Sequence, residues 1–364
     1  EPTHVETINE RIPTAVLGAT GSVGQRMVSL LADHPWFDVV ELVASERSAG
    51  RSYRDAAHWL LSSPMPAAVA DLEVVPLHAD LRSPLALSAL DADVAGPAED
   101  RLARAGHLVV SNAKSHRMRS DVPLLIPEVN PDLLQLINEQ AYDGGAIVTN
   151  PNCSTIGLVL ALKPLHDAFG VEKVHVVTMQ AISGAGFPGI SSLQVMDNLI
   201  PFISGEEEKL ESETRKILGR LEGGRIRESE ITISAQCTRV PVLDGHTECI
   251  SVKLGRPATE EEIIEVWEGF RAAPQWLDLP SAPLRPIIYD RSESAPQPRI
   301  HRDAGSGMAV TIGRLRPCTL FDFKFVALSH NTIRGAAGGS LLAAEMAVGQ
   351  RVLPSLAPPA SPKD

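Results

Sequence analysis

Short apolar runs alternate with amphipathic segments from residue 14 to residue 149. Residues 25–32 carry apolar side chains at helical spacing, and a second helical stretch covers 94–105. The apolar runs, which we interpret as strands, are 14–17, 38–45, 84–90, 107–112 and 146–149. Strands that alternate with helices are typical of a parallel sheet. The pattern therefore predicts an α/β fold with a Rossmann-like domain over residues 1–151.

The pattern changes after residue 152. Apolar and polar positions now alternate in the segments 172–180, 247–254, 308–315 and 322–328. This alternation is typical of strands with one covered face, so we predict an α+β catalytic and dimerisation domain with a mixed sheet over 152–334. A charged helix covers 206–221 and ends near Gly223-Gly224. A small-residue helix over 335–352 should complete the first domain, and the proline-rich 353–364 should be an unstructured end.

A glycine-rich turn lies between the first predicted strand and the first helix. It reads Gly18-Ala-Thr-Gly21-Ser-Val-Gly24, with GxxGxxG spacing in place of GxGxxG. A strand, a glycine turn, a helix and a second strand are the context of a dinucleotide site, where a pyrophosphate approaches the helix N-terminus. A turn that only closes an ordinary βαβ unit is the alternative. The predicted cofactor contacts in this turn are Gly18, Thr20, Gly21, Ser22, Val23 and Gly24.

The end of the second predicted strand indicates which nicotinamide nucleotide binds. Glu46 could accept the ribose 2′-hydroxyl of NAD, yet Ser45, Arg47 and Ser48 surround it. Arg47 is suited to pair with a 2′-phosphate, and Glu46 can turn away into solvent. We therefore favour NADP(H), with Ser45, Arg47 and Ser48 as contacts.

A cysteine follows the fifth predicted strand. Cys153 stands in Asn150-Pro-Asn-Cys-Ser-Thr-Ile-Gly157, before an apolar stretch at 156–162 that suits a buried helix ending at Lys163-Pro164. Near a helix N-terminus, unpaired N–H groups and the helix dipole favour a thiolate and could hold a developing oxyanion. A small core cysteine in a turn is the alternative. The flanking Asn, Ser and Thr residues would be an unusual wall for an apolar core, so we interpret Cys153 as a nucleophile.

A nucleophilic cysteine needs an acid or base partner, and the chain has eleven histidines. His246 stands out because it follows an Asp-Gly turn at the mouth of a strand, with the cation Arg239 seven residues earlier. Gln180 ends a strand before the flexible loop 181–186. Each has a plainer interpretation: a surface histidine, a salt-bridge partner and an amide that caps backbone groups.

Basic residues in two places could receive an anion. The segment 112–117, which contains Lys114 and Arg117, follows a strand of the first domain. Lys209 lies on the charged helix with Glu206 three residues before it. An exposed ion pair is the plainer interpretation of Glu206 and Lys209.

Composition argues against several classes of protein. The chain has 33 basic and 45 acidic residues, a net charge of −12, which argues against a general nucleic-acid or anionic-membrane binder. Four widely spaced cysteines without a CxxC pair indicate neither a disulfide framework nor a zinc site, and we expect no metal. Apolar stretches fall short of the ~18 residues of a membrane span, and residues 1–12 lack a signal peptide's apolar stretch. We expect a cytoplasmic protein.

Several of these segments, taken in order, resemble aspartate-β-semialdehyde dehydrogenases, most of all the archaeal and fungal branch. The resemblance covers residues 15–338. The segments that carry it are 18–25, 111–118, 123–131, 150–155, 180–186, 239–247 and 331–338. Each is modest alone, whereas their order and joint presence are highly specific.

The resemblance implies a two-domain fold like that of glyceraldehyde-phosphate dehydrogenase, assembled as a homodimer or homotetramer. It also implies NADPH-dependent reduction of L-aspartyl-4-phosphate to L-aspartate-4-semialdehyde and phosphate, a step in lysine, threonine and methionine biosynthesis. Cys153 would form a thioester, His246 would act as acid and base, and Gln180 would orient the acyl intermediate.

The resemblance implies roles for the remaining polar residues as well. Arg239 would bind the substrate carboxylate and Glu206 its ammonium group, although three consecutive acids leave the register of Glu206 open. Asn331 and Gly184 would meet the nicotinamide end of NADP. The phosphate would be held by Lys209, Asn152 and Arg117, with Lys114 nearby.

Three alternatives remain open from the sequence. One is another acyl reductase on the same scaffold, acting on N-acetylglutamyl phosphate or malonyl-CoA. The second is a cysteine hydrolase or amidotransferase that uses Cys153 and His246 without a nicotinamide. The third is a non-catalytic protein that binds NADP or senses redox state.

Overall fold

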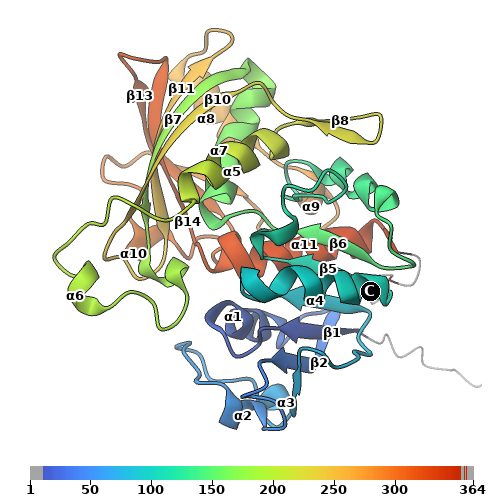
Figure 1. The fold of residues 1–364 in the computed structure, drawn as a ribbon. Coiled ribbons are helices and arrows are strands. Elements are labelled where there is room, and N and C mark those ends of the chain that lie inside the picture. The colour runs from blue at the N-terminus through green and yellow to red at the C-terminus, as the bar shows by residue number, and fades with distance from the viewer. Residues whose placement is uncertain (1–10, 354–355, 357, 359–364) are drawn as a thin grey trace, which may run out of the picture.

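Two six-stranded sheets organise the chain, and a two-stranded hairpin projects beside them (Figure 1). The computed structural model describes residues 11–353, 356 and 358. The expected unstructured end at 353–364 otherwise lies outside the described residues. Two of its described members, Leu353 and Leu356, are buried in the core of the first sheet.

The first sheet has the strand order β3-β2-β1-β4-β5-β6, and every pair in it is parallel. The strand order reverses between β1 and β4, and such a reversal opens a crevice at the carboxyl ends of the strands. The strands are β1 (Ile12–Leu17), β2 (Phe37–Ala44), β3 (Val74–Pro76), β4 (Leu85–Ser88), β5 (Leu108–Ser111) and β6 (Ala146–Thr149).

Helices cover both faces of this sheet. Val16 of β1 packs in one cluster with α1 (Ser22–Leu31) and α11 (Gly338–Gly349). Its neighbours Ala15 and Leu17 pack on the opposite face, in a cluster that includes Leu102 of α4 (Ala92–Arg104). Burial on both faces explains why these strands are continuously apolar. The C-terminal helix α11 therefore returns to the core of the first sheet.

The second sheet is mixed, with the order β10-β7-β11-β14-β13-β12. The pairs β10–β7 and β12–β13 are parallel and the others are antiparallel. Together the two sheets confirm the predicted fold class. The strands are β7 (Val171–Gln180), β10 (Thr232–Arg239), β11 (His246–Leu254), β12 (Ile287–Asp290), β13 (Val310–Pro317) and β14 (Phe323–Ser329).

One face of the second sheet is covered by helices, which produces the alternation seen in the sequence. α5 (Cys153–Phe169) packs on the central strands, α7 (Glu206–Ile217) lies against β10, and α8 (Glu260–Gly269) lies against α5 and β12. Trp267 of α8 is fully buried and its indole N–H donates to the Ala161 carbonyl of α5. α5 is thus a central helix of the second core.

The structure corrects two predicted helix ends. The helix expected to stop at Lys163-Pro164 continues to Phe169, because Leu165 and Phe169 remain buried in the core. The charged helix expected over 206–221 stops at Ile217. Residues 220–222 instead form β8 (Arg220–Glu222), which pairs with β9 (Arg225–Arg227) through Gly223 and Gly224, both at positive φ.

The remaining helical segments are short. A π turn (Ile333–Ala337) leads directly into α11, at the start of the helix expected from residue 335. No helix in the described part of the chain is long and apolar enough to cross a bilayer. The other short segments are α2 (Tyr53–Ala56), α3 (Ala67–Ala70), α6 (Ser192–Val195), α9 (Ala273–Trp276), α10 (Pro298–His301), and 3-10 turns at Lys114–His116, Pro131–Glu139 and Ile182–Ala185.

Candidate active site

A cavity of about 690 Å³ joins the glycine turn after β1 to the start of α5. Its wall includes Cys153, the tip of the glycine turn at 20–23 and the loop at 183–187. Asn331 and the π turn close it from the C-terminal side. The predicted nucleophile and the predicted dinucleotide site therefore share one space.

The turn after β1 requires glycine at two positions, Gly18 and Gly24, because a side chain there would collide with the main chain. Gly18 has a φ of +73°, and a Cβ at this position would lie 2.6 Å from the Ala89 carbonyl oxygen. A Cβ at Gly24 would overlap the Gly18 carbonyl oxygen. Gly21 is the residue directly before α1 and provides no side-chain cap, so the first N–H groups of the helix remain available to an anion.

The turn after β2 presents a cation to the same cavity. Arg47 lines the cavity, whereas Glu46 pairs with His78 (Oε1 to Nδ1, 3.0 Å) on the exposed surface. Ser45 and Ser48 close this turn, since the Ser48 N–H donates to the Ser45 carbonyl at 2.8 Å. The carboxylate that would favour NAD is therefore engaged elsewhere, and an arginine suited to a 2′-phosphate remains.

Cys153 and His246 are in direct contact, with 3.1 Å between Sγ and Nε2. Cys153 is the first residue of α5, and Asn152 caps this helix by accepting the N–H groups of Ser154 and Thr155. His246 is the first residue of β11 and is fully buried. The predicted proximity of the two side chains is thus present in the structure.

The main chain fixes which nitrogen of His246 carries the proton. The Ala181 N–H donates to Nδ1 at 3.0 Å. Nδ1 must then be an acceptor, so the neutral ring carries its proton on Nε2, the nitrogen that faces Cys153 Sγ.

Burial opposes ionisation of both groups. It raises the pKa of the Cys153 thiol to about 12, and the Glu206 carboxylate acts in the same direction. It lowers the pKa of His246 to about 3, and the Arg239 cation adds to that effect. In the protein without ligands, the pair is therefore a thiol beside a neutral imidazole, and the helix N-terminus alone does not produce a thiolate.

Glycines allow the main chain to approach this pair closely. A Cβ on Gly335, in the π turn, would lie 2.7 Å from Cys153 Cβ. A Cβ on Gly184 would lie 2.9 Å from Arg239 Nη1 and 3.3 Å from His246 Cε1. Both positions therefore require glycine for the reactive groups to keep their places.

Asn331 ties two loops of the site together. Its Oδ1 accepts the Gly245 N–H, directly before His246, at 2.8 Å, and its Nδ2 donates to Ser183 Oγ at 2.8 Å. Asn331 also lines the cavity. A dinucleotide that runs from the glycine turn toward Cys153 would therefore place its nicotinamide ring near Asn331.

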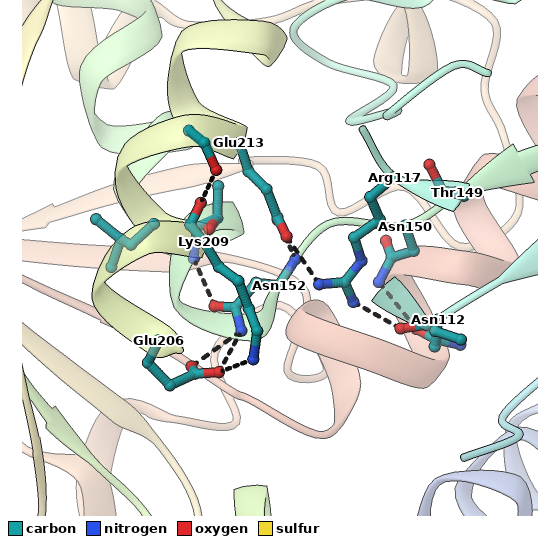
Figure 2. Close-up of polar contacts among 12 residues, drawn as sticks. Asn112, Arg117, Thr149, Asn150, Asn152, Glu206, Lys209 and Glu213 are labelled. Carbon is teal, nitrogen blue, oxygen red and sulfur yellow. Dashed lines mark hydrogen bonds and ion pairs between the residues drawn. The ribbon is translucent and has the colours of Figure 1, made fainter. Parts of the chain in front are cut away.

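A buried acid, Glu206, contacts Lys209 and the side-chain amide of Asn152, the residue directly before Cys153 (Figure 2). Glu206 accepts from Lys209 Nζ (2.6 Å), Asn152 Nδ2 (2.9 and 3.1 Å) and Gln180 Nε2 (3.2 Å). Gln180 also donates to Ser154 Oγ. Burial raises the pKa of Glu206, but the hydrogen bonds from Lys209, Asn152 and Gln180 outweigh it and keep the pKa below its usual value.

The structure resolves the register of the three consecutive acids. Glu206 is buried at the start of α7, Glu207 accepts the Cys237 N–H, and Glu208 is exposed. The plainer interpretation of Glu206 and Lys209 as an exposed pair is wrong, because Glu206 is only 8% exposed. Only the first of the three acids reaches the site.

Arg239 supplies a buried cation near Cys153. It ends β10 beside Gln180, which ends the neighbouring strand β7. Its Nη1 donates to the Ala181 carbonyl at 2.6 Å. Burial lowers the pKa of Arg239, while Cys153 and Glu206 raise it. The surface salt-bridge interpretation of Arg239 is therefore wrong.

Arg117, not Lys114, faces the cavity. Arg117 is 7% exposed and lines the cavity, whereas Lys114 is exposed and lies outside its wall. Arg117 donates to the Asn112 carbonyl (2.6 Å) and to Glu213 (2.9 Å). Sequence reasoning missed Glu213, although it lies four residues after Lys209 on the helix, and such spacing places both on one face.

Comparisons with known proteins agree with this geometry. Residues 13–137 match the family described as semialdehyde dehydrogenase, NAD binding domain, and residues 162–334 match semialdehyde dehydrogenase, dimerisation domain. An aspartate-semialdehyde dehydrogenase of Archaeoglobus fulgidus is 47% identical, over 94% of this chain and 100% of that protein. One from Schizosaccharomyces pombe is 47% identical, over 92% of this chain and 97% of that protein.

Solved structures show the same relationship. The aspartate-semialdehyde dehydrogenase of Candida albicans with NADP superposes with a TM-score of 0.88 and 43% identity, covering 94% of this chain and 100% of that one. A Vibrio cholerae aspartate-semialdehyde dehydrogenase II complexed with ASA has a TM-score of 0.75 and 27% identity, covering 93% and 98%. The resemblance drawn from the sequence is confirmed: the chain belongs to the aspartate-semialdehyde dehydrogenase family.

Proposed function

We propose that the chain catalyses NADPH-dependent reduction of L-aspartyl-4-phosphate to L-aspartate-4-semialdehyde and phosphate, through a thioester on Cys153. One observation carries the proposal: the Cys153–His246 pair and the glycine turn line or adjoin the same cavity. Family membership over nearly the whole chain supports it.

NADP fits the groups that line its half of the cavity. The glycine turn, with Gly18, Gly21 and Gly24, leaves the N-terminus of α1 free for the pyrophosphate, and Thr20, Ser22 and Val23 line it. Arg47, in the turn closed by Ser45 and Ser48, would hold the 2′-phosphate. Gly184 and Asn331 would border the nicotinamide. When bound, the reduced cofactor supplies the hydride, and no metal is required.

Cys153 and His246 divide the covalent chemistry. Sγ attacks the acyl carbon, the bond from that carbon to the phosphate oxygen breaks, and phosphate leaves with the bonding pair. The resulting thioester is reduced to a thiohemiacetal, whose carbon–sulfur bond then breaks to release the aldehyde. The thiol proton leaves on the departing phosphate. His246 acts as the acid through its Nε2–H, which stabilises the oxyanion formed when the thioester is reduced, and when the carbon–sulfur bond breaks Sγ takes up one proton from solvent through the same imidazole. Gln180, beside both Ser154 and Glu206, orients the acyl group.

The charged residues divide the substrate among them. Arg239 binds the α-carboxylate, and Glu206 binds the ammonium group. An arriving ammonium would displace Lys209 from Glu206, which frees Lys209 to join Arg117 and Asn152 at the phosphate; Lys114 remains nearby on the surface. Lys209 can leave the buried Glu206 carboxylate only if another cation replaces it, and this exchange favours a free amino acid over N-acetylglutamyl phosphate or malonyl-CoA.

Replacing the nucleophile tests the proposal. Cys153→Ser should abolish phosphate-dependent oxidation of aspartate semialdehyde, while the dissociation constant for NADP stays within about twofold, because a hydroxyl fills the space of the thiol but is a far weaker nucleophile. Calorimetry measures NADP binding by both proteins. A parallel assay measures turnover of the wild-type chain on aspartyl phosphate, N-acetylglutamyl phosphate and malonyl-CoA. Turnover on malonyl-CoA alone would show that the protein is a different acyl reductase. Absence of NADP binding would instead support a cysteine hydrolase.

We also propose that the second domain forms a homodimer, with a dimer of dimers as the larger alternative. The match to a dimerisation domain over residues 162–334 supports this. Large apolar side chains lie exposed on one segment of that domain, with exposures of 95% for Leu193, 66% for Met196 and 69% for Phe202. Sedimentation equilibrium would distinguish the two assemblies, and a monomer would contradict both.

A further inference from the structure

One face of α7 carries charged residues at each successive turn. Glu206 and Lys209 belong to the proposed amino-acid and phosphate sites. Glu213 and Lys216 follow on the same face and are buried, with exposures of 2% and 3%. The proposed chemistry does not use these last two, and burying a charge is costly unless it is paired. Their contacts therefore need an explanation.

The Glu213 carboxylate joins two parts of the site that are far apart in sequence (Figure 2). Its Oε1 accepts from Arg117 Nη1 at 2.9 Å, and its Oε2 accepts from the Asn152 main-chain N–H at 2.7 Å. Arg117 follows β5 of the first sheet, whereas Asn152 is the residue directly before the nucleophile. One carboxylate thus sets the spacing between Arg117 and Cys153.

Lys216 binds the main chain of the loop that follows β5 and contains Arg117. Its Nζ donates to the carbonyl oxygens of Arg117 (2.5 Å), Arg119 (2.7 Å) and Val122 (2.9 Å). These contacts use all three donors of the ammonium group. Burial lowers the pKa of Lys216 to about 8, against the opposing effect of Asp121 and Glu213. α7 is therefore attached to the Arg117 loop by both a side chain and main-chain groups.

These contacts leave Arg117 with free donors at the cavity. Nη1 is engaged by Glu213 and Nη2 by the Asn112 carbonyl, while the buried Nε has no partner within the described residues. A guanidinium has five N–H donors, so donors beyond these two contacts remain. Arg117 lines the cavity beside Asn152 and Cys153. Its orientation is thus set by protein acceptors before any anion binds.

We propose that Glu213 is a positioning residue for the phosphate group, acting through Arg117 and through the main chain at Asn152. This inference rests on the proposed function. Glu213 holds the guanidinium and the N-terminus of α5 at a fixed spacing, and α7 transmits that spacing to Glu206 and Lys209. The four charged residues of one helix face thereby relate the phosphate end of the substrate to its ammonium end.

Glu213→Gln is the sharpest single change, because it keeps the shape and removes one acceptor. An amide presents one oxygen, so it can accept from Arg117 or from the Asn152 N–H but not from both; its NH₂ group opposes the other donor. The KM for phosphate in semialdehyde oxidation should rise at least about tenfold. The KM for the semialdehyde and the dissociation constant for NADP should stay within about twofold. Glu208→Gln, on the exposed face of the same helix, is the matched control and should change none of the three.

A double-mutant cycle separates positioning from a general structural role. If Glu213 acts in part through Arg117, Glu213→Gln should raise the phosphate KM by a smaller factor in the Arg117→Ala background than in the wild type, because only the contact with the Asn152 N–H is then left to lose. Multiplied effects would overturn the inference, and so would an unchanged phosphate KM in Glu213→Gln. If that variant fails to fold, Glu213→Asp keeps the charge with a shorter reach and should raise the same KM; an unchanged value there would also overturn it. A wild-type chain without phosphate-dependent oxidation would instead refute the proposed function.

Discussion

The sulfur of Cys153 lies where burial and charge act in opposite directions. Burial and Glu206 favour the thiol, whereas the Arg117 and Arg239 cations favour the thiolate. Burial prevails in the protein without ligands. Almost no thiolate is therefore present beforehand, and the thiol proton must leave as Sγ forms its bond to the acyl carbon.

The pH dependence of alkylation tests this picture. With the pKa of Cys153 raised to about 12, the thiolate is a small fraction that grows with pH, so its alkylation by iodoacetamide should rise about tenfold per pH unit between about pH 6 and about pH 9. Peptide mass spectrometry would follow Cys153, with the exposed Cys249 as an internal reference. A plateau with a midpoint near neutral pH would contradict the neutral pair.

The sequence predicted these residues unevenly, for physical reasons. Cys153 comes shortly after strand β6, and His246 begins β11 directly after a tight turn. Such positions are recognisable because strands and tight turns have local signals. Burial is not local: Glu206 and Lys209 at i,i+3 have the same spacing as a solvated surface pair. Glu213 was missed because its partners are 61 and 96 residues away. Only the packed helix reveals which of its charges face inward.

Most strands with one covered face were predicted well. Elements were predicted poorly where the local sequence signal disagrees with the tertiary packing. The strands β7, β11 and β14 alternate clearly and were found. Pro164 is a strong local stop signal, yet the buried residues that follow it keep the helix going. Strand β10 was missed despite its alternating burial, and the three-residue strand β3 is too short to carry a period.

The turn after β2 is the element whose chemistry sets cofactor choice. Arg47→Ala should weaken NADP binding at least about tenfold and leave NAD binding within about twofold, because only NADP carries the 2′-phosphate that the guanidinium would pair with. Calorimetric titration with both nucleotides measures the difference. Glu46→Gln in the same turn is the control and should alter neither affinity, since Glu46 pairs with His78 on the surface. Equal losses of NADP and NAD would exclude the proposed phosphate contact.

The chain passes between its two sheets twice, and the site lies at both passages. The first leads from β6 through Asn152 and Cys153 into α5. The second leads from β14 through the π turn into α11. Arg334, in that π turn, forms a buried two-point ion pair with Glu128, at 2.7 and 2.6 Å. Gly335 beside it packs against Cys153, so this ion pair and the nucleophile share one piece of main chain.

Glu128→Ala should therefore destabilise the whole molecule. The change leaves the Arg334 guanidinium, 1% exposed, without its carboxylate, and breaking a buried pair in this way costs roughly 3–5 kcal/mol. Urea denaturation followed by tryptophan fluorescence measures the loss. Asp71→Asn breaks the exposed pair with Arg54 and should cost less than about 1 kcal/mol. If Glu128→Ala were as mild as this control, the second passage would not be held by its ion pair, and the packing of α11 alone would have to fix the main chain at Cys153.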